Sequence, residues 1–557
     1  MIRLAFALCA ALLASSAHAD TLFTNVNGVR TDSTGGIDRF TGMLVGNDGK
    51  VKRLLHGEMF RMTGDTKVVD VGGRALLPGL IDAHGHIMGL GFGALQLDLV
   101  GTSSVQDLQK RLSAYVAANP GSGWISGRGW NQELWPDSRF PSAADLDAVV
   151  ANRPVILERV DGHAVVINSA ALKAARITAA TKDPVGGKIE RDSAGKPTGL
   201  LIDSATELVG KVTPPPTPAE RDRALAEAQR ILLGYGITAA ADMGTSLDDW
   251  AAMNRAGETG ALKVRIMAYA MGVEPLKQVT RPTGWLYADH LRMGGVKLYD
   301  DGALGSRGAW LKAPYTDMPS TRGLMFHSDA ELLQLADTAT SHGFQVATHA
   351  IGDAANAQVI ATYEKLAAKY LGDRRWRIEH FQIVDPVDIP RLKPAGIIAS
   401  MQPTHQTSDR LMAEKRLGPD RLEGAYAWQT VERLGIPLAF GSDFPVESPN
   451  PFPGLSAAIS RQDPQGQPPG GWRPQERLSF AQALAAFTRT AAYAGFADGK
   501  FGTLEPGEWA DFIVVDRDPS AVNPQSLAAT KVLETWIAGT RTWSASKANA
   551  ERVERGQ

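Results

Sequence analysis

The sequence predicts an α/β protein built on a TIM-like (β/α)8 barrel, with a small composite β-sandwich from both chain ends and a large insertion after the first barrel strand. Three observations lead to this prediction. From Ala219 onward, helical patterns alternate with compact apolar runs, as expected for parallel strands joined by helices. With the earlier run in RALLPGLIDAHGH there are eight apolar runs, the number that closes a barrel. Short β-type runs broken by Gly-containing turns flank this block on both sides.

The chain begins with a segment typical of a secretory signal peptide. Arg3 precedes the apolar stretch 4–14, and Ala17 and Ala19 form a small-residue site that predicts cleavage after Ala19. A buried first helix is the alternative interpretation. Cleavage would remove residues 1–19, including Cys9, the only cysteine, so a mature protein that is periplasmic or secreted would contain no disulfide.

The domain bounds follow from where short β-type runs give way to alternating strands and helices in the remaining sequence. Residues 20–77 and 497–545 are predicted to form the composite β-sandwich, and Asn47-Asp48-Gly49 predicts a hairpin turn within it. Residues 78–496 are predicted to form the barrel, with an insertion at 90–213 that we expect to fold over the barrel mouth. An open doubly wound sheet is the alternative, but no G-x-G-x-x-G motif follows any predicted strand.

Residues able to bind a metal stand at the carboxyl ends of the predicted strands, where barrel enzymes carry out their chemistry. Neutral imidazole nitrogens and a carboxylate oxygen are ligands that zinc-like ions take. The sequence therefore predicts a divalent metal, with zinc as the expected ion and two ions per chain favoured over one. The predicted ligands are His84, His86, Lys297, His349, His380 and Asp443.

The position of Lys297 favours two metal ions over one. It lies between Val296 and Leu298, so on a strand it faces the barrel interior. A buried amine driven toward neutrality can react with carbon dioxide to give a carbamate, and N-carboxylated Lys297 could bridge two metals. The alternative is a metal-free ion pair between Lys297 and Asp443.

An ordered set of motifs resembles the amidohydrolase superfamily, in particular the amidohydrolase family 3 branch that includes N-substituted formamide deformylase. The motifs run through nearly the whole mature chain: PGLIDAHGH, GRGWNQELWPDSRFP, DGHAVVINSAAL, VKLYDDGALGSRG, THAIGDAAN, RIEHFQ, MQPTH and GSDFPV. The resemblance implies one metal on His84 and His86, a second on His349 and His380, and carboxylated Lys297 as the bridge. It also implies that Asp443 binds the first metal and the nucleophilic water. A carboxylate in that position could accept the proton of a metal-activated hydroxide and deliver it to the departing amine.

Four further residues are weaker candidates for binding substrate. His163 falls in the insertion, His405 follows the seventh strand, and Asp301 and Arg307 follow Lys297. Packing or loop-stabilising roles are the alternative for each of them.

Together these features predict an exported, metal-dependent amidohydrolase that acts on carbon–nitrogen bonds other than peptide bonds. It would open an amide, N-acyl or N-formyl bond of a small organic substrate through a metal-activated hydroxide. Hydrolysis of an ester, lactone or phosphoester, or metal binding without catalysis, are the alternatives. The net charge of -2 gives no reason to expect a nucleic-acid partner, and no membrane contact is expected after signal cleavage. An oligomer is compatible with the sequence.

Overall fold

The computed structural model describes residues 19–59, 61, 65–160, 162–184 and 186–548. The predicted signal peptide thus lies outside the described residues, except for Ala19. Two compact units are present: one contains the described residues up to Ile87 and from Gln229 onward, and the other is Met88–Ala228. No helix within the described ranges has the length and apolar character needed to cross a membrane.

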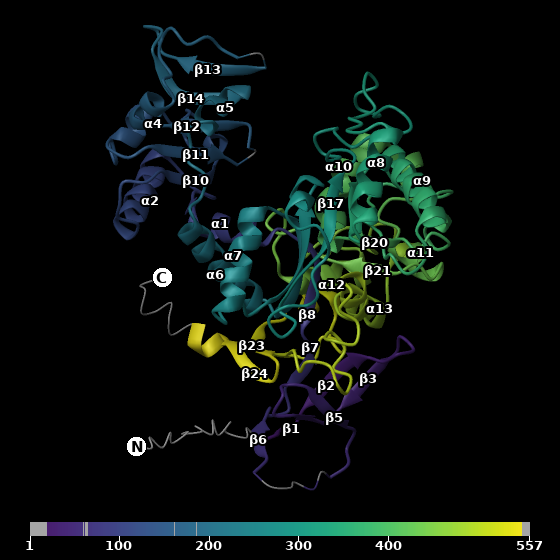
Figure 1. Cartoon of the computed structure of the whole chain (residues 1–557). Helices are drawn as coiled ribbons and strands as arrows, with labels where there is room; N and C mark the ends of the chain where they lie inside the picture. Colours follow the sequence, from purple (N-terminus) through teal and green to yellow (C-terminus); the bar gives the residue numbers. More distant parts are fainter. Residues whose placement is uncertain (1–18, 60, 62–64, 161, 185, 549–557) are drawn as a thin grey trace, which may run out of the picture. The chain divides into compact units, whose positions relative to one another are not determined.

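The first unit contains the predicted eight-strand parallel sheet, which forms a nearly closed barrel (Figure 1). The strands follow one another around the sheet in chain order, and the last returns to the first. Asp443 N donates to His84 O and His86 N donates to Phe444 O, both at 2.7 Å, next to a bridge between Gly85 and Phe444. The strands are β8 (Leu80–Gly85), β15 (Ile237–Thr245), β16 (Arg265–Met271), β17 (Leu291–Tyr299), β18 (Gln345–Ala350), β19 (Arg377–His380), β20 (Ile398–Met401) and β21 (Leu438–Phe440).

Helices follow most of these strands, as the alternating pattern predicted. Several begin at side chains that cap free backbone N–H groups: Ser246 accepts from Asp249 N, and Ser328 forms a capping box with Glu331. The helices of this unit are α7 (Leu247–Glu258), α8 (Asp329–Ser341), α9 (Asp353–Lys369), α10 (Pro403–Leu417), α11 (Trp428–Arg433), α12 (Pro451–Ser460), α13 (Phe480–Ala486), α14 (Arg489–Ala494) and α15 (Pro524–Ala528).

The run RALLPGLIDAHGH, in which the first barrel strand was predicted, forms two strands that belong to different sheets. Strand β7 (Ala75–Pro78) pairs with β2 and β22, whereas β8 belongs to the barrel. Gly79 lies between them, and a Cβ there would be 2.1 Å from Thr238 Oγ1. The chain therefore changes sheets at a residue where a side chain would not fit.

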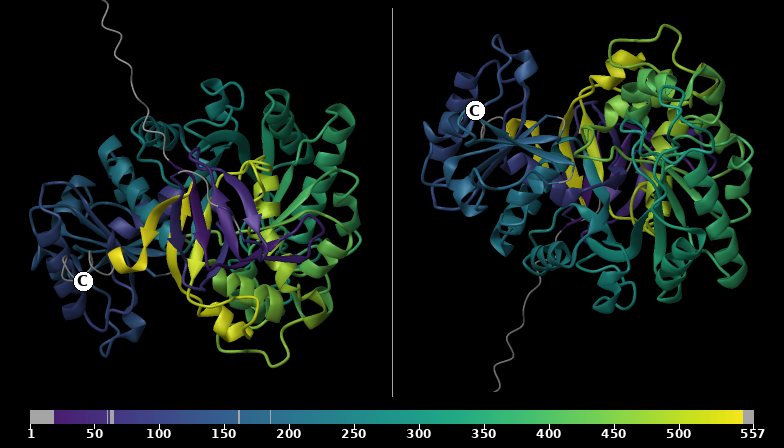
Figure 2. Two further views of the ribbon diagram at one scale, coloured as in Figure 1. Left: turned by 90° about the horizontal axis from the view of Figure 1, so that it is seen from below. Right: turned by 90° about the horizontal axis from the view of Figure 1, so that it is seen from above.

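Strands from both chain ends share a sheet in this unit, and Figure 2 shows the purple and yellow strands side by side. Phe23, Phe512 and Trp536 pack together in the core of these strands, with ring centroids 5.0 to 5.3 Å apart. The predicted Asn47-Asp48-Gly49 turn joins antiparallel β4 and β5. One sheet has the order β24 (Thr540–Ser544), β23 (Val532–Ile537), β22 (Phe512–Val515), β7, β2 (Asn27–Thr31), β3 (Ile37–Phe40), and the other has the order β5 (Val51–Leu55), β4 (Gly42–Val45), β1 (Thr21–Thr24), β6 (Lys67–Asp70).

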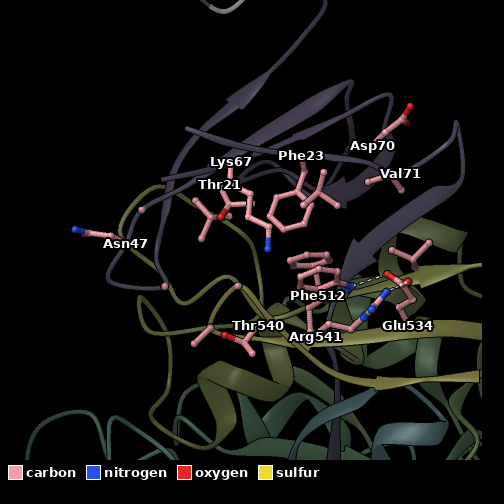
Figure 3. A pocket seen from close by; sticks show the side chains of 18 of the residues that line it. Thr21, Phe23, Asn47, Lys67, Asp70, Val71, Phe512, Glu534, Thr540 and Arg541 are labelled. Carbon is pink, nitrogen blue, oxygen red and sulfur yellow. Dashed lines mark hydrogen bonds and ion pairs between the residues drawn. The ribbon is translucent and has the colours of Figure 1, made fainter. Parts of the chain in front are cut away.

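A cavity of about 570 Å³ lies among these strands (Figure 3). Lys67 reaches into it near Phe512, and Glu534 on its wall is paired with Arg541 at 2.9 Å. None of the predicted metal ligands lines it, so this cavity is separate from the candidate metal centre.

The second unit has its own mixed sheet and two apolar cores, one around Trp130 and Leu157 and the other around Ile167 and Leu201. The predicted insertion, 90–213, falls within this unit. That the insertion folds over the barrel mouth stays a prediction. The predicted domain bounds also stay predictions. The sheet order is β13 (Gly187–Arg191), β14 (Pro197–Asp203), β12 (Ala164–Ile167), β11 (Val155–Arg159), β10 (Ile125–Trp130), β9 (Leu97–Asp98); the helices are α2 (Val105–Ala118), α3 (Ala143–Asp147), α4 (Ser169–Ala174) and α5 (Glu207–Gly210), and α1 (Ile87–Leu95) and α6 (Pro218–Gly234) contain the unit boundaries.

Gly441 allows the segment after β21 to approach β8. A Cβ at Gly441 would lie 2.4 Å from His84 N, a backbone atom that cannot rotate away. We expect Gly441→Ala to lower the free energy of unfolding by about 1–3 kcal/mol through overpacking, as measured by urea denaturation of metal-free protein. Gly284→Ala is the matched control, because nothing lies within 4 Å of a Cβ there. Equal stability of the two variants would contradict this account of the barrel closure.

Candidate metal centre

The six predicted ligands come from five strands or strand ends and lie together at the carboxyl end of the barrel. His84 Nε2 and His86 Nε2 lie 3.5 and 3.2 Å from Asp443 Oδ1. The His380 ring centroid is 4.6 Å from that of His84 and 4.5 Å from that of His349. Lys297 Nζ is 3.3 Å from His84 Nε2. The convergence that the sequence pattern predicted is therefore present in the fold.

A buried ion pair orients His84. Its Nδ1 lies 2.6 Å from Glu379 Oε2, and Arg377 binds both carboxylate oxygens of Glu379 at 2.7 and 3.1 Å. Burial opposes ionisation of Glu379, but the Arg377 charge outweighs it and lowers the pKa of Glu379 to about 2. Burial, with the nearby Lys297 charge, lowers the pKa of His84 to about 3. His84 is therefore neutral, with Nε2 directed toward Asp443, as a metal ligand requires.

His380 and His349 also have polar neighbours on one ring nitrogen. His380 Nδ1 lies 2.9 Å from Gln402 Oε1, and burial lowers the pKa of His380 well below its usual value. His349 Nε2 lies 3.4 Å from Asp301 Oδ1. The Gln402 contact leaves Nε2 of His380 available to a ligand, and Nε2 of His349 makes no hydrogen bond with Asp301 at that distance.

Lys297 is 1% exposed, and no ion pair joins it to a carboxylate in the described part of the chain. Burial lowers its pKa to about 8. The geometry thus disfavours the metal-free ion pair with Asp443, and it provides an amine that is partly neutral near physiological pH.

Asp443 has an unusual backbone conformation and a perturbed carboxyl group. Its φ is +61° and that of His380 is +73°, a region that costs non-glycine residues about 1–3 kcal/mol and is found mainly at functional sites. Burial opposes ionisation of Asp443, but a hydrogen bond from His86 and the neighbouring histidines hold its pKa below the usual range. Asp443 is therefore an anion that faces the imidazoles.

The residues fit a divalent cation. Two groups have ligand atoms that all lie within 4.8 Å of one another: His84, His86 and Asp443, and His380, His405 and Asp443. The buried Nε2 atoms of His349 and His405 have no hydrogen-bond partner among the described residues. Neutral imidazoles with one carboxylate are a donor set suited to zinc.

The four weaker candidates have different environments. His405 lies at the cluster, with Nε2 3.8 Å from Asp443 Oδ2. Asp301 lies beside His349, where it accepts hydrogen bonds from Trp310 N, Ile351 N and Gly352 N. Arg307 is held by Asp317 at 2.9 and 3.1 Å, so the structure favours its loop-stabilising interpretation. His163 belongs to the second unit, where its Nδ1 lies 3.0 Å from Asp203.

The sequence interpretation missed the residues that support the ligands, namely Arg377, Glu379 and Gln402. A signal for two of them was present, since Arg377 and Glu379 are charged residues two apart in a short strand, and they share one face. Gln402 directly follows β20 and carries no comparable signal.

A nearly closed parallel barrel with imidazoles and a carboxylate at its carboxyl end defines a class of metal-binding barrel proteins. The sequence profile of the amidohydrolase family matches residues 67–542. The chain is 35% identical to Protein LONG AFTER FAR-RED 3 of Arabidopsis thaliana over 488 residues, covering 85% of this chain and 83% of that protein. It is 26% identical to the N-substituted formamide deformylase of Arthrobacter pascens, covering 85% of this chain and 89% of that enzyme.

A solved structure is also similar to this chain in both fold and sequence. It is that of an uncharacterized metal-dependent hydrolase from Pyrococcus horikoshii OT3, with a TM-score of 0.77 and 26% identity, covering 91% of this chain and 99% of that chain. The chain belongs to the amidohydrolase family, as the resemblance in its motifs predicted. Membership of this family makes the protein a metal-dependent hydrolase.

Proposed function

We propose that this protein hydrolyses a carbon–nitrogen bond, an amide, N-acyl or N-formyl bond of a small organic molecule. One observation carries the proposal: the ionised Asp443 faces three imidazoles at 3.2 to 3.8 Å at the carboxyl end of the barrel. A binding protein would need ligands but no acid placed to carry protons. The 26% identity to an enzyme named N-substituted formamide deformylase supports the choice of bond.

The residues have separable roles in this proposal. His84, His86 and Asp443 would hold one zinc ion, and His349, His380 and N-carboxylated Lys297 a second, with Lys297 as the bridge. Divalent cations at such a site supply Lewis acidity, which activates water near neutral pH and polarises a carbonyl. Asp443 accepts the proton of the attacking water and delivers it to the leaving nitrogen, since amines leave poorly without protonation. Glu379 and Gln402 keep His84 and His380 oriented throughout. We also propose export through the predicted signal peptide.

Paired substrates test the choice of bond. Protein purified without chelator would be assayed against an N-formyl amine and the formyl ester of the matching alcohol, before and after metal removal. We expect amide hydrolysis that chelation abolishes and zinc restores. Turnover of the ester or a phosphoester without the amide would overturn the proposal, and metal binding with no turnover would favour a non-catalytic protein.

The pKa of Lys297 gives a pH-dependent prediction for its carboxylation. Only the neutral amine attacks carbon dioxide, and below the Lys297 pKa of about 8 most of the amine is protonated. With bicarbonate adjusted at each pH so that dissolved carbon dioxide stays constant, we expect the rate of carbamate formation in metal-free protein to rise between about pH 7 and 9 and to level off above the pKa. The measurement is the carbamate signal in carbon-13 NMR after addition of labelled bicarbonate. Lys297→Arg is the control, and an equal signal in that variant would show that Lys297 is not the site.

A further inference from the structure

The position of His405 is not explained by a substrate contact alone. His405 is the third residue of α10, the helix that begins directly after Gln402, and Gln402 contacts His380 Nδ1. The rings of His380 and His405 are nearly parallel, with centroids 6.0 Å apart and an interplanar angle of 16°. His405 is 9% exposed, and its Nε2 is buried without a hydrogen-bond partner within the described ranges. A buried ring nitrogen without a hydrogen-bond partner lowers the stability of the fold unless a ligand or a metal ion binds to it.

The two oxygens of Asp443 face different histidines. Oδ1 lies 3.5 and 3.2 Å from the Nε2 atoms of His84 and His86, whereas Oδ2 lies 3.8 Å from the Nε2 of His405. A hydrogen bond to His405 is excluded at 3.8 Å. Ligands about 2.1 Å from a tetrahedral zinc ion lie about 3.4 Å from one another, so these distances resemble separations between ligand atoms.

We propose that His405 is a metal ligand, which completes a second set with His380 and Asp443 beside the set of His84, His86 and Asp443. Asp443 would then give one oxygen to each set. The ligand atoms within each set already lie within 4.8 Å of one another. The cation would be a divalent ion of the zinc type, because the set has two imidazoles and one carboxylate. This inference deepens the proposed function and rests on it, since it adds a side chain from α10 to the second ion.

The test is metal content, measured by mass spectrometry after dialysis against buffered zinc, together with a competition titration against a chromophoric chelator. His405→Phe retains an aromatic ring beside His380 but removes Nε2. We expect the wild type to hold about two ions and His405→Phe about one. The control is His342→Phe, the same change at an exposed histidine that caps the C-terminal end of α8, and it should keep both ions.

Each outcome has a distinct meaning. If His405→Phe keeps both ions at unchanged affinity while its activity falls, His405 is a substrate contact and the inference is wrong, although the proposed function stands. If the wild type binds no ion, the proposed function itself fails. If His405→Phe does not fold, the absorption spectrum of cobalt-loaded His405→Asp tests whether residue 405 is a ligand. Replacing a nitrogen ligand by an oxygen shifts the cobalt absorption bands, whereas bands identical to the wild type would overturn the inference.

Discussion

Asp443→Asn is expected to lower kcat for hydrolysis by about two to four orders of magnitude, the usual contribution of a positioned acid or base. Asparagine can still offer an oxygen to a cation, but it cannot accept the proton of water or protonate a leaving nitrogen. The measurement is kcat at saturating zinc, with bound metal determined on the same samples.

Saturating metal separates the two roles of Asp443. Asp420→Asn, at an exposed acid remote from the cluster, is the matched control and should retain wild-type kcat. Wild-type kcat in Asp443→Asn would exclude Asp443 as the proton carrier. A loss of activity that is seen at limiting zinc and disappears at saturating zinc would reduce Asp443 to a ligand.

Arg377→Met is expected to destabilise the metal-free protein by about 3–5 kcal/mol, because it leaves the carboxylate of Glu379 buried without its cation. Arg377 and Glu379 are both fully buried, and Arg377 also donates to Tyr269 OH, Ala83 O and Ser400 Oγ. Zinc affinity should also fall, by about 10- to 100-fold, since the support of His84 is weakened. Urea denaturation and a chelator titration measure the two effects.

The double variant Arg377→Met/Glu379→Gln should recover part of the lost stability, because no charge is then left unpaired. Arg433→Met, at an exposed arginine, is the surface control. The pH dependence gives a further check. The pKa of Glu379 in the folded protein is about 2, below its ordinary value of 4.5, so its stabilising contribution is present above pH 4.5 and is lost as the pH falls toward 2. Arg377→Met should lose this acid dependence, and its persistence would contradict the role given to the ion pair.

The barrel was predictable because most of its strands are short apolar runs and several end at a residue whose chemistry is out of place in a core. His349 at the end of β18 and His380 at the end of β19 have that property. Since the carboxyl ends of parallel strands meet at one face, the chain order was enough to predict their convergence.

Other features depend on three-dimensional packing. The predicted domain boundary between residues 77 and 78 falls close to Gly79, but residues 75–81 are apolar throughout, and only the pairing of β7 with β22 divides them between two sheets. His405 was predicted only as a weaker candidate for binding substrate, because spacing along the chain cannot show that its ring faces Asp443 Oδ2. The role of the insertion, residues 90–213, also depends on packing that sequence patterns do not encode.

The central claim is that these imidazoles and Asp443 share divalent cations at the carboxyl end of the barrel. The most direct measurement is an anomalous difference map at the zinc edge, from crystals of protein purified without chelator. The account predicts a peak about 2.0–2.2 Å from His84, His86 and Asp443, with a second peak beside His380. Zinc-loaded, folded protein with no peak at His84, His86 and Asp443 would contradict it.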